Sequence, residues 1–232
     1  NYFEIVNTAY RSINQTEAEL YRNKIIEIEP TNYQAWLLKG KSAGWQSTIQ
    51  NPRFSESVSA FSKAIANAPL DKKEAVVDDI KEEIKNLAKA LISLRASRFT
   101  KWPDGDETAG FLSDIVSILN AIVQFCKTAG VVMQTNEIME PIAAQINQAV
   151  VEVYQNKILP DYRAENFPDK YTWETFIERV DYCTTLVEKA ITLTDSDDQE
   201  DIQRYENLIF LHEQAIDSCS WSSEYCDFDP YN

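Results

Sequence analysis

The sequence predicts an all-α protein, and three observations support this prediction. Apolar residues recur at three- and four-residue steps through most of the chain, which is the spacing of one helix face. Only five glycines and eight prolines occur among 232 residues, as is typical of long helices joined by few turns. No segment shows the two-residue alternation of a half-buried strand. We therefore expect antiparallel helical hairpins, more regular before residue 70 than after it.

Two helical hairpins are expected within the first 69 residues. Their helices cover 2–13, 16–29, 33–48 and 54–68. Pro30 and Pro69 close the two hairpins, because proline has no amide donor and its ring clashes with the preceding turn. Side chains that can cap a helix start occur in pairs with the spacing of a capping box. These pairs are Asn14 with Glu17 and Thr31 with Gln34.

The closing segments of the two hairpins resemble each other and lie 39 residues apart. A repeat of this length is typical of stacked helical hairpins. In these residues the chain resembles the tetratricopeptide repeat family, whose usual period is about 34 residues. It departs from the family pattern at Lys39, Ala43 and Ser57. The matching residues are Trp36 and Gly40 on one first helix, Phe61, Ala64 and Pro69 on its second helix, and Tyr2, Ala18 and Pro30 in the preceding unit.

The resemblance is confined to about residues 1–69 and implies a protein–protein interaction module. In the family, the first helices of the hairpins form a concave surface that holds a peptide or a partner helix. The resemblance therefore implies that Trp36 and Gly40 are buried, and that Asn32, Tyr33 and Lys41 are the partner-binding positions. The stretch 32–40 also resembles bacterial repeat proteins that carry an N-terminal zinc ribbon, although this chain has no ribbon. An unrelated helical bundle with similar small–large packing is the alternative.

A long helix is expected from Asp71 and Glu74 to Trp102, where Pro103 ends it. Its apolar residues have the three–four alternation of a coiled-coil seam. Two interpretations stay open, namely a homodimer formed through the Val77–Leu94 helix, and packing against other helices of the same chain. The seam residues are Val77, Ile80, Ile84, Leu87, Leu91 and Leu94.

Three lysines, Lys81, Lys85 and Lys89, line another face of this helix at four-residue steps. They form either a patch that binds an acidic partner or a solvated face that pairs with the chain's own acidic half.

The C-terminal part is expected to form an irregular helical bundle or solenoid. Asp104 and Glu107 cap a helix that is apolar nearly all round and is therefore expected to be central and buried. Gly130 ends that region, and Pro141 falls in the first turn of the next helix, where proline is tolerated. The expected helices cover 107–127, 136–158, 171–193 and 198–217, with a long loop over 159–170.

The net charge of −15 is unevenly distributed. Residues 1–100 contain 14 Lys or Arg and 12 Asp or Glu, whereas residues 101–232 contain 8 and 25. An acidic half repels nucleic acid and anionic lipid, so these partners are disfavoured. The expected partner is another protein or peptide, and a basic one is favoured. No apolar run approaches the length of a membrane span, so we expect no membrane insertion.

No set of residues predicts an active site, a metal site or a cofactor. His212 has no companion histidine, and a lone helical histidine is usually structural. Asp195, Asp197, Gln199 and Glu206 have EF-hand-like offsets, but Glu200 occupies the position that needs glycine. Helix capping by Asp197 and Glu200 is the alternative interpretation.

The four cysteines do not form a CxxC pair, which disfavours a zinc site. Free thiols in a reducing cytoplasm are the expected state, with a Cys219–Cys226 disulfide as the alternative for an exported protein. The chain begins at Asn1 without a methionine or a signal-like segment, so we expect a fragment from which a targeting segment could be missing. The expected location is the cytoplasm. The aromatic, acidic tail from Trp221 to Tyr231 is either a docking motif or a cover for an apolar helix end.

Together these features predict a scaffold or adaptor without catalytic activity. Residues 1–69 form the repeat-like hairpins, and residues 70–232 form an acidic helical region packed on them or continuous with them. One alternative is a self-assembling, dimerising helical module. The other is a metal-dependent or carboxylate-based enzyme hidden in the acidic half.

Overall fold

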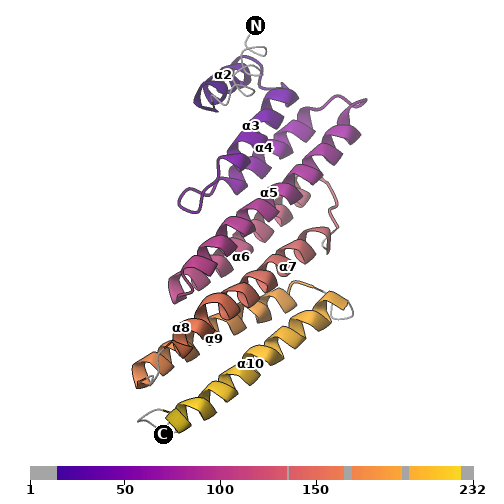
Figure 1. The fold of residues 1–232 in the computed structure, drawn as a ribbon. Coiled ribbons are helices and arrows are strands. Elements are labelled where there is room, and N and C mark those ends of the chain that lie inside the picture. Colours follow the sequence, from indigo (N-terminus) through magenta and orange to yellow (C-terminus); the bar gives the residue numbers. More distant parts are fainter. Residues whose placement is uncertain (1–14, 135, 165–168, 195–198, 226–232) are drawn as a thin grey trace. The chain divides into compact units, whose positions relative to one another are not determined.

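Every regular element of the computed structural model is helical within the residues that it describes, which are 15–134, 136–164, 169–194 and 199–225. The all-α prediction is confirmed (Figure 1). The expected helix 2–13, the cap at Asn14 and most of the C-terminal tail lie outside the described residues. The first helices are α2 (Gln15–Ile28), α3 (Tyr33–Trp45), α4 (Phe54–Asn67), α5 (Lys73–Lys101) and α6 (Gly105–Ala129). They are followed by α7 (Asn136–Val153), a π-helical turn η1 (Tyr154–Ile158), α8 (Leu159–Arg163), α9 (Lys170–Ile191) and α10 (Gln199–Tyr225).

The chain divides into two compact units, and the division does not fall at residue 69. Unit 1 comprises residues 1–91 and 116–134, and unit 2 comprises residues 92–115 and 135–232. The helices α5 and α6 each contribute to both units. With 29 residues, α5 is about 44 Å long, roughly twice the length of the 14-residue α4. Because α5 is longer than the helices of the preceding hairpin, one part of it packs in unit 1 and the other part in unit 2.

The core of unit 1 is centred on the α3–α4 hairpin, whose two helices lie side by side in Figure 1. Gly40, Phe61 and Ala64 are buried there, as the family resemblance implies. Trp36 differs from that expectation. Its indole is only partly buried, because the ring lies at the edge of the hairpin, where Nε1 donates a hydrogen bond to the Pro30 carbonyl at 2.8 Å.

The helix α3 begins with a cap at Asn32 rather than at Thr31. The Asn32 side-chain oxygen accepts a hydrogen bond from the Ala35 amide at 3.0 Å, which satisfies one of the free donors at the helix start. The Asn32 amide group also donates to Glu29 Oε2 at 3.0 Å. The cap of this helix thus lies one residue later than the predicted cap at Thr31.

The middle of the expected seam on α5 is covered by the chain itself. Ile80, Ile84 and Leu87 are at most 1% exposed within unit 1. Leu94, at the other end of the seam, is 47% exposed. The burial of these residues favours packing within the chain for the middle of this helix, and the homodimer through the Val77–Leu94 helix stays a prediction.

The helix α6 is capped as predicted but is not buried all round. Asp104 Oδ1 accepts a hydrogen bond from the Glu107 amide at 2.8 Å. Gly130 ends the helix with φ +65°, and the Val131 amide bonds back to the Cys126 carbonyl, as in a Schellman-type end. Val116 and Val123, however, are 47% and 61% exposed, so this side of α6 is not part of the core.

Among the described helices, α6 alone is long and apolar enough to cross a membrane. Core helices of soluble proteins also pass this test of length and composition. The expectation that the chain does not insert into a membrane stays a prediction.

In unit 2, the expected loop over 159–170 is partly helical. The helix α7 continues through the π turn η1 into α8, and the Leu159 amide donates to the Tyr154 carbonyl. Pro160 is accommodated near the start of α8, where a missing amide is tolerated. Tyr162 of α8 is buried and stacks on Phe176 of α9 at 4.3 Å between ring centroids. Pro141 is the sixth residue of α7, one turn later than expected.

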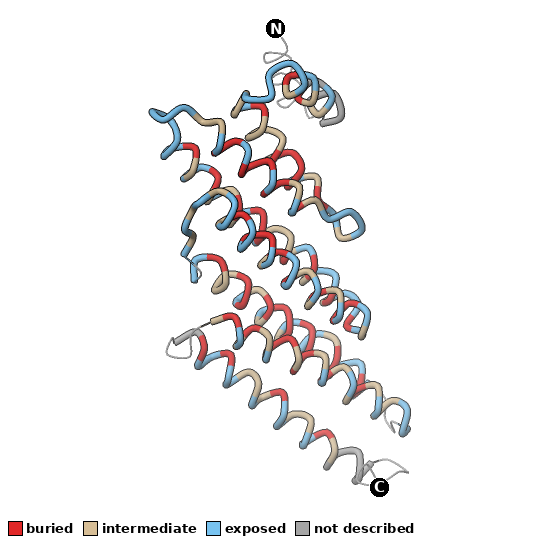
Figure 2. The backbone as a smooth tube through the Cα atoms, turned by 180° about the vertical axis from the view of Figure 1, so that it is seen from behind, coloured by how far each residue is buried: buried red, intermediate tan, exposed pale blue. Residues whose placement is uncertain are grey.

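The last helix, α10, packs on α9 and α7 and is longer than the predicted 198–217. Buried positions recur along one side of it, and Figure 2 shows them alternating with exposed ones. Arg204 lies on this inner side and is 2% exposed. Its guanidinium contacts Glu140 of α7 at 2.7 Å and Asp201 at 2.5 Å. The predicted cap at Asp197 lies outside the described residues.

Candidate functional site

An open groove of about 680 Å³ lies between α4 and α6 in unit 1. Its floor is apolar and its rim consists of short hydroxyl and amide side chains. The lining residues are Ser55, Val58, Ser59, Ser62, Lys63 and Ala66 from α4, and Ser117, Asn120, Ala121, Gln124, Phe125 and Thr128 from α6.

The rim follows from the spacing of small polar residues on both helices. Ser55 and Ser59 are one turn apart on α4, and Asn120 and Gln124 are one turn apart on α6. All four side chains are exposed, whereas Phe125 in the floor is 2% exposed. Because the rim side chains are short, the two helices do not close over the apolar floor.

The groove contains one ionisable residue, Lys63, and no carboxylate among its lining residues. The Lys63 ammonium lies 4.2 Å from the centroid of the Trp36 ring, and the Lys39 ammonium lies 5.6 Å from the same centroid. Such cation–π contacts orient the lysines without neutralising them. One margin of the groove is therefore positively charged.

The predicted partner-binding residues of α3 do not line this groove. Asn32 is used to cap α3, and Tyr33 is the partly buried first residue of that helix. Lys41 forms an ion pair with Asp79 at 3.0 Å and approaches Glu83 at 3.8 Å. Lys41 therefore joins α3 to α5 within unit 1.

The contact between α3 and α5 also includes an exposed tryptophan. Trp45 Nε1 donates a hydrogen bond to Glu83 Oε1 at 2.5 Å, and the Trp45 side chain is 53% exposed. Next to it, Gly44 is buried against Leu87. Lys41 and Trp45 thus link α3 to α5, and the predicted partner-binding role of Lys41 stays a prediction.

The three lysines of α5 differ in exposure. Lys89 is exposed, whereas Lys81 and Lys85 are partly buried, and Lys85 lies 3.8 Å from Glu82 on the same helix. The pairing of Lys85 within its own helix agrees with a solvated face. None of the three is among the lining residues of the groove.

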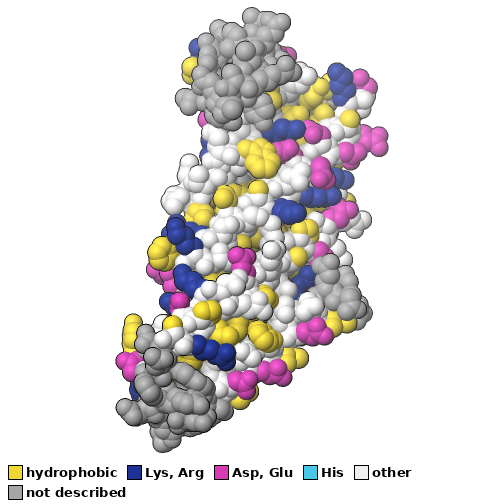
Figure 3. All heavy atoms as spheres, viewed as in Figure 1, with side chains coloured by type: hydrophobic (Ala, Val, Ile, Leu, Met, Phe, Trp, Pro, Cys, Tyr) yellow, Lys and Arg dark blue, Asp and Glu magenta, His cyan; other side chains and the backbone are white. Residues whose placement is uncertain are grey.

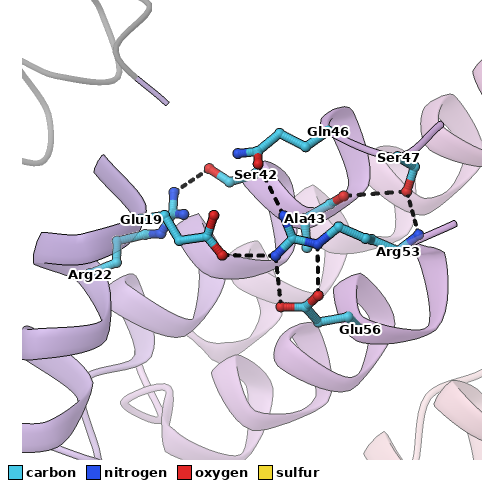
Figure 4. A network of polar contacts seen from close by, with 8 residues as sticks. All are labelled: Glu19, Arg22, Ser42, Ala43, Gln46, Ser47, Arg53 and Glu56. Carbon is cyan, nitrogen blue, oxygen red and sulfur yellow. Dashed lines mark hydrogen bonds and ion pairs between the residues drawn. The ribbon is translucent and has the colours of Figure 1, made fainter. Parts of the chain in front are cut away.

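A polar network joins α2, α3 and α4 (Figure 4). The Arg53 guanidinium donates to both carboxylate oxygens of Glu56, at 2.8 and 3.0 Å, and to Glu19 Oε1 at 2.8 Å. These hydrogen bonds raise the pKa of Arg53 and hold the pKa of Glu56 below its usual value. The buried Arg22 donates to the hydroxyl of Ser42 on the other side of the network. These contacts pair the Arg53 guanidinium with two carboxylates and join the three helices.

Unit 2 contains a smaller polar hollow of about 230 Å³ between α5 and α7. Its lining includes Ser93, Ser97, Gln145 and Glu152. Gln145 Nε2 donates to Ser93 Oγ at 2.5 Å, while the buried Gln145 Oε1 has no protein partner. One carboxylate and the three hydroxyls of Ser93, Ser97 and Thr100 do not by themselves define a reaction.

The other candidate residues for chemistry are also isolated. Burial raises the pKa of the Cys183 thiol to about 12, so this thiol stays protonated and unreactive at neutral pH. His212 lies on the exposed side of α10. Within the described residues, no three His, Cys, Asp or Glu side chains come together in a way that could hold a metal ion.

Sequence reasoning missed the groove because none of its residues has a chemical signature. Serine, asparagine and glutamine on a helix are typical of a face that is exposed to solvent. The available signal was the recurrence of short polar residues, including Ser117 and Gln124, on a helix that is otherwise apolar.

Comparison of the chain with protein-family models, with curated protein sequences and with solved structures finds no match.

Proposed function

We propose that this chain is a protein-interaction module without catalytic activity of its own, and that the α4–α6 groove receives an extended segment of a partner protein. The observation that carries the proposal is the groove itself, which combines an apolar floor with a rim of hydroxyl and amide groups. Binding sites of this kind use apolar surface for affinity and a few polar groups for orientation.

The rim chemistry favours an extended peptide over a helix. The side chains of Ser59, Asn120 and Gln124 can donate to carbonyls and accept from amides. An extended segment presents its backbone N–H and C=O groups for such hydrogen bonds, whereas a helix uses them internally. The floor around Phe125 would accept aliphatic side chains of the segment.

The charge of the groove favours a neutral or acidic segment. Lys63 is the sole ionisable lining residue, and Lys39 lies over the same indole ring. A carboxylate of the partner would be attracted to this margin, and a basic segment would be repelled.

Panning a random peptide library displayed on phage against the full chain tests this proposal. A selected peptide is labelled and titrated against the protein by fluorescence anisotropy. Asn120→Trp would fill the groove and should weaken binding at least tenfold. Val123→Trp is the matched control, because Val123 lies on the same helix, is 61% exposed and does not line the groove.

The sequence of the selected peptides is a second result. We expect extended, Pro-tolerant segments with acidic or neutral residues and few lysines or arginines. Recovery of no specific binder, or equal binding by the Asn120→Trp variant and the parent, would contradict the assignment of the groove.

A further inference from the structure

The outer side of α10 presents a row of exposed apolar side chains. Ile202, Tyr205, Ile209 and Ile216 are 49%, 45%, 56% and 63% exposed. They are separated by three, four and seven residues, and the exposed His212 occupies the intermediate step. This is the a/d spacing of a two-heptad coiled-coil seam. We refer to these five residues as the α10 stripe.

The α10 stripe is a second face of the helix, because the first face is already packed. On the inner side, Asn207 Nδ2 donates a hydrogen bond to Asn147 Oδ1 of α7 at 2.9 Å. Phe210 lies edge-on to Tyr154, with 5.6 Å between the ring centroids. Leu211 is 1% exposed. The attachment of α10 to unit 2 therefore does not require the α10 stripe.

The exposed charged groups that α10 itself places beside the stripe are all acidic. Glu206 and Glu213 follow the two d positions and so occupy e positions, and Asp217 lies next to Ile216. All three are exposed. Arg204, the single basic residue within 199–225, is buried against Asp201 and Glu140. Figure 3 shows acidic and hydrophobic side chains next to one another along α10.

This charge pattern disfavours the chain itself as the occupant of the α10 stripe. Two antiparallel copies of α10 would bring Glu206 of one copy against Glu213 of the other, and either orientation adds carboxylates without adding a cation. The sequence after α10, residues 226–232, contains two aspartates and no lysine or arginine. A self-complementary interface or a covering tail would need the opposite charge.

We propose that the α10 stripe binds an amphipathic helix of another protein whose apolar residues are flanked by lysine or arginine. The apolar side chains of the partner would pack between Ile202, Ile209 and Ile216. Its basic residues would pair with the glutamates in the e positions, which sets orientation and excludes acidic helices. This surface belongs to unit 2, so the proposal does not depend on the α4–α6 groove of unit 1.

The test is an anisotropy titration of the full chain with two labelled, designed peptides of about 21 residues, or three heptads. Both carry Leu at a and d, and their flanking positions are Lys in one peptide and Glu in the other. We expect saturable binding of the Lys peptide with a Kd on the order of 10 µM or tighter, and at least tenfold weaker binding of the Glu peptide. Binding of the Lys peptide should weaken as salt is raised from about 50 to 500 mM.

Two double variants locate the binding surface. Ile209→Ser with Ile216→Ser should weaken binding of the Lys peptide at least tenfold. Val116→Ser with Val123→Ser removes two aliphatic side chains of similar exposure from α6 and should leave binding unchanged. Hydrogen exchange of the complex should show added protection in 202–216 and none in α4.

Three results would overturn the proposal: no saturable binding of the Lys peptide at about 0.1 mM protein, equal binding of the two peptides, or equal binding by the stripe variant and the parent. A concentration-dependent dimer that the stripe variant abolishes would also overturn it, in favour of a second copy as the occupant. None of these results bears on the α4–α6 groove, which the Asn120→Trp variant tests separately.

Discussion

The aromatic ring of Phe61 packs directly on the backbone of Gly40, where α3 and α4 meet. A Cβ atom built at Gly40 would overlap the ring atoms Cδ1 and Cε1 of Phe61 and would lie 3.0 Å from Cζ. Ser57, one turn before Phe61, donates a hydrogen bond to the Gly40 carbonyl at 2.7 Å. The serine that departs from the repeat pattern thus strengthens the same helix contact. Glycine is needed at position 40 because the ring approaches the backbone so closely.

The replacement Gly40→Ala should therefore destabilise the protein. In an exposed helix this change raises the free energy of unfolding by about 1 kcal/mol, but overpacking a buried site lowers it by about 1–3 kcal/mol. Phe61 is fully buried and cannot move aside, so we expect a net loss of about 1 kcal/mol in urea unfolding. The loss should be smaller in a Phe61→Leu background. A stabilised Gly40→Ala variant would show that the two helices can separate without loss.

Helix positions were predictable where a local signal decides them. Pro30 and Pro69 follow the ends of α2 and α4, and Asp104 caps α6. The burial of Gly40 was also predictable, because glycine at this position of the repeat pattern indicates that two helices pack closely there. A proline or a capping side chain acts within a few residues of the helix end that it defines.

Features that depend on which helices become neighbours were not predictable. Trp36 is half-buried because the hairpin edge ends beside it, and Pro160 is accommodated because a π turn precedes it. On α10, apolar residues recur around the helix, and spacing alone does not reveal that Leu211 faces the core while Ile209 faces outward. The groove likewise depends on α4 and α6 coming together, although they are distant in the sequence.

The ion pair between Arg53 and Glu56 makes stability depend on pH in a defined direction. The hydrogen bonds from Arg53 lower the pKa of Glu56 in the folded state. Because the unfolded-state value is about 4.3, the pair stabilises the fold above that pH. This contribution is lost as the pH falls through the lower folded-state value.

We therefore expect the urea midpoint of the parent to fall more steeply between about pH 5 and pH 3 than that of Glu56→Gln. The control is Glu174→Gln, which removes a carboxylate from an exposed pair with Lys170 at 3.9 Å and should follow the parent. Parallel curves for the parent and Glu56→Gln would mean that the Arg53 network does not persist in solution.

Cys183 should resist alkylation in the folded protein. Burial raises the pKa of its thiol to about 12 and leaves none of its surface accessible. Cys126, which is partly exposed, should react first with iodoacetamide at pH 7.5. Mass spectrometry of tryptic peptides after a timed reaction distinguishes the two sites, and denatured protein provides full labelling as the reference. Labelling of Cys183 at the rate of Cys126 would indicate that the core of unit 2 opens readily.

Replacing Arg204 alone should destabilise the protein more than replacing Arg204 and Asp201 together. Arg204 and Asp201 are 2% and 1% exposed, and Arg204 also contacts Glu140 at 2.7 Å. Arg204→Met leaves Asp201 without its cation and should lower the free energy of unfolding by about 3–5 kcal/mol. The double replacement Arg204→Met with Asp201→Leu removes both buried charges, so chemical denaturation should show recovery of most of that loss. If the double variant is as unstable as the single one, the ion pair itself stabilises α10 and its attraction exceeds the free energy of removing both charges from water.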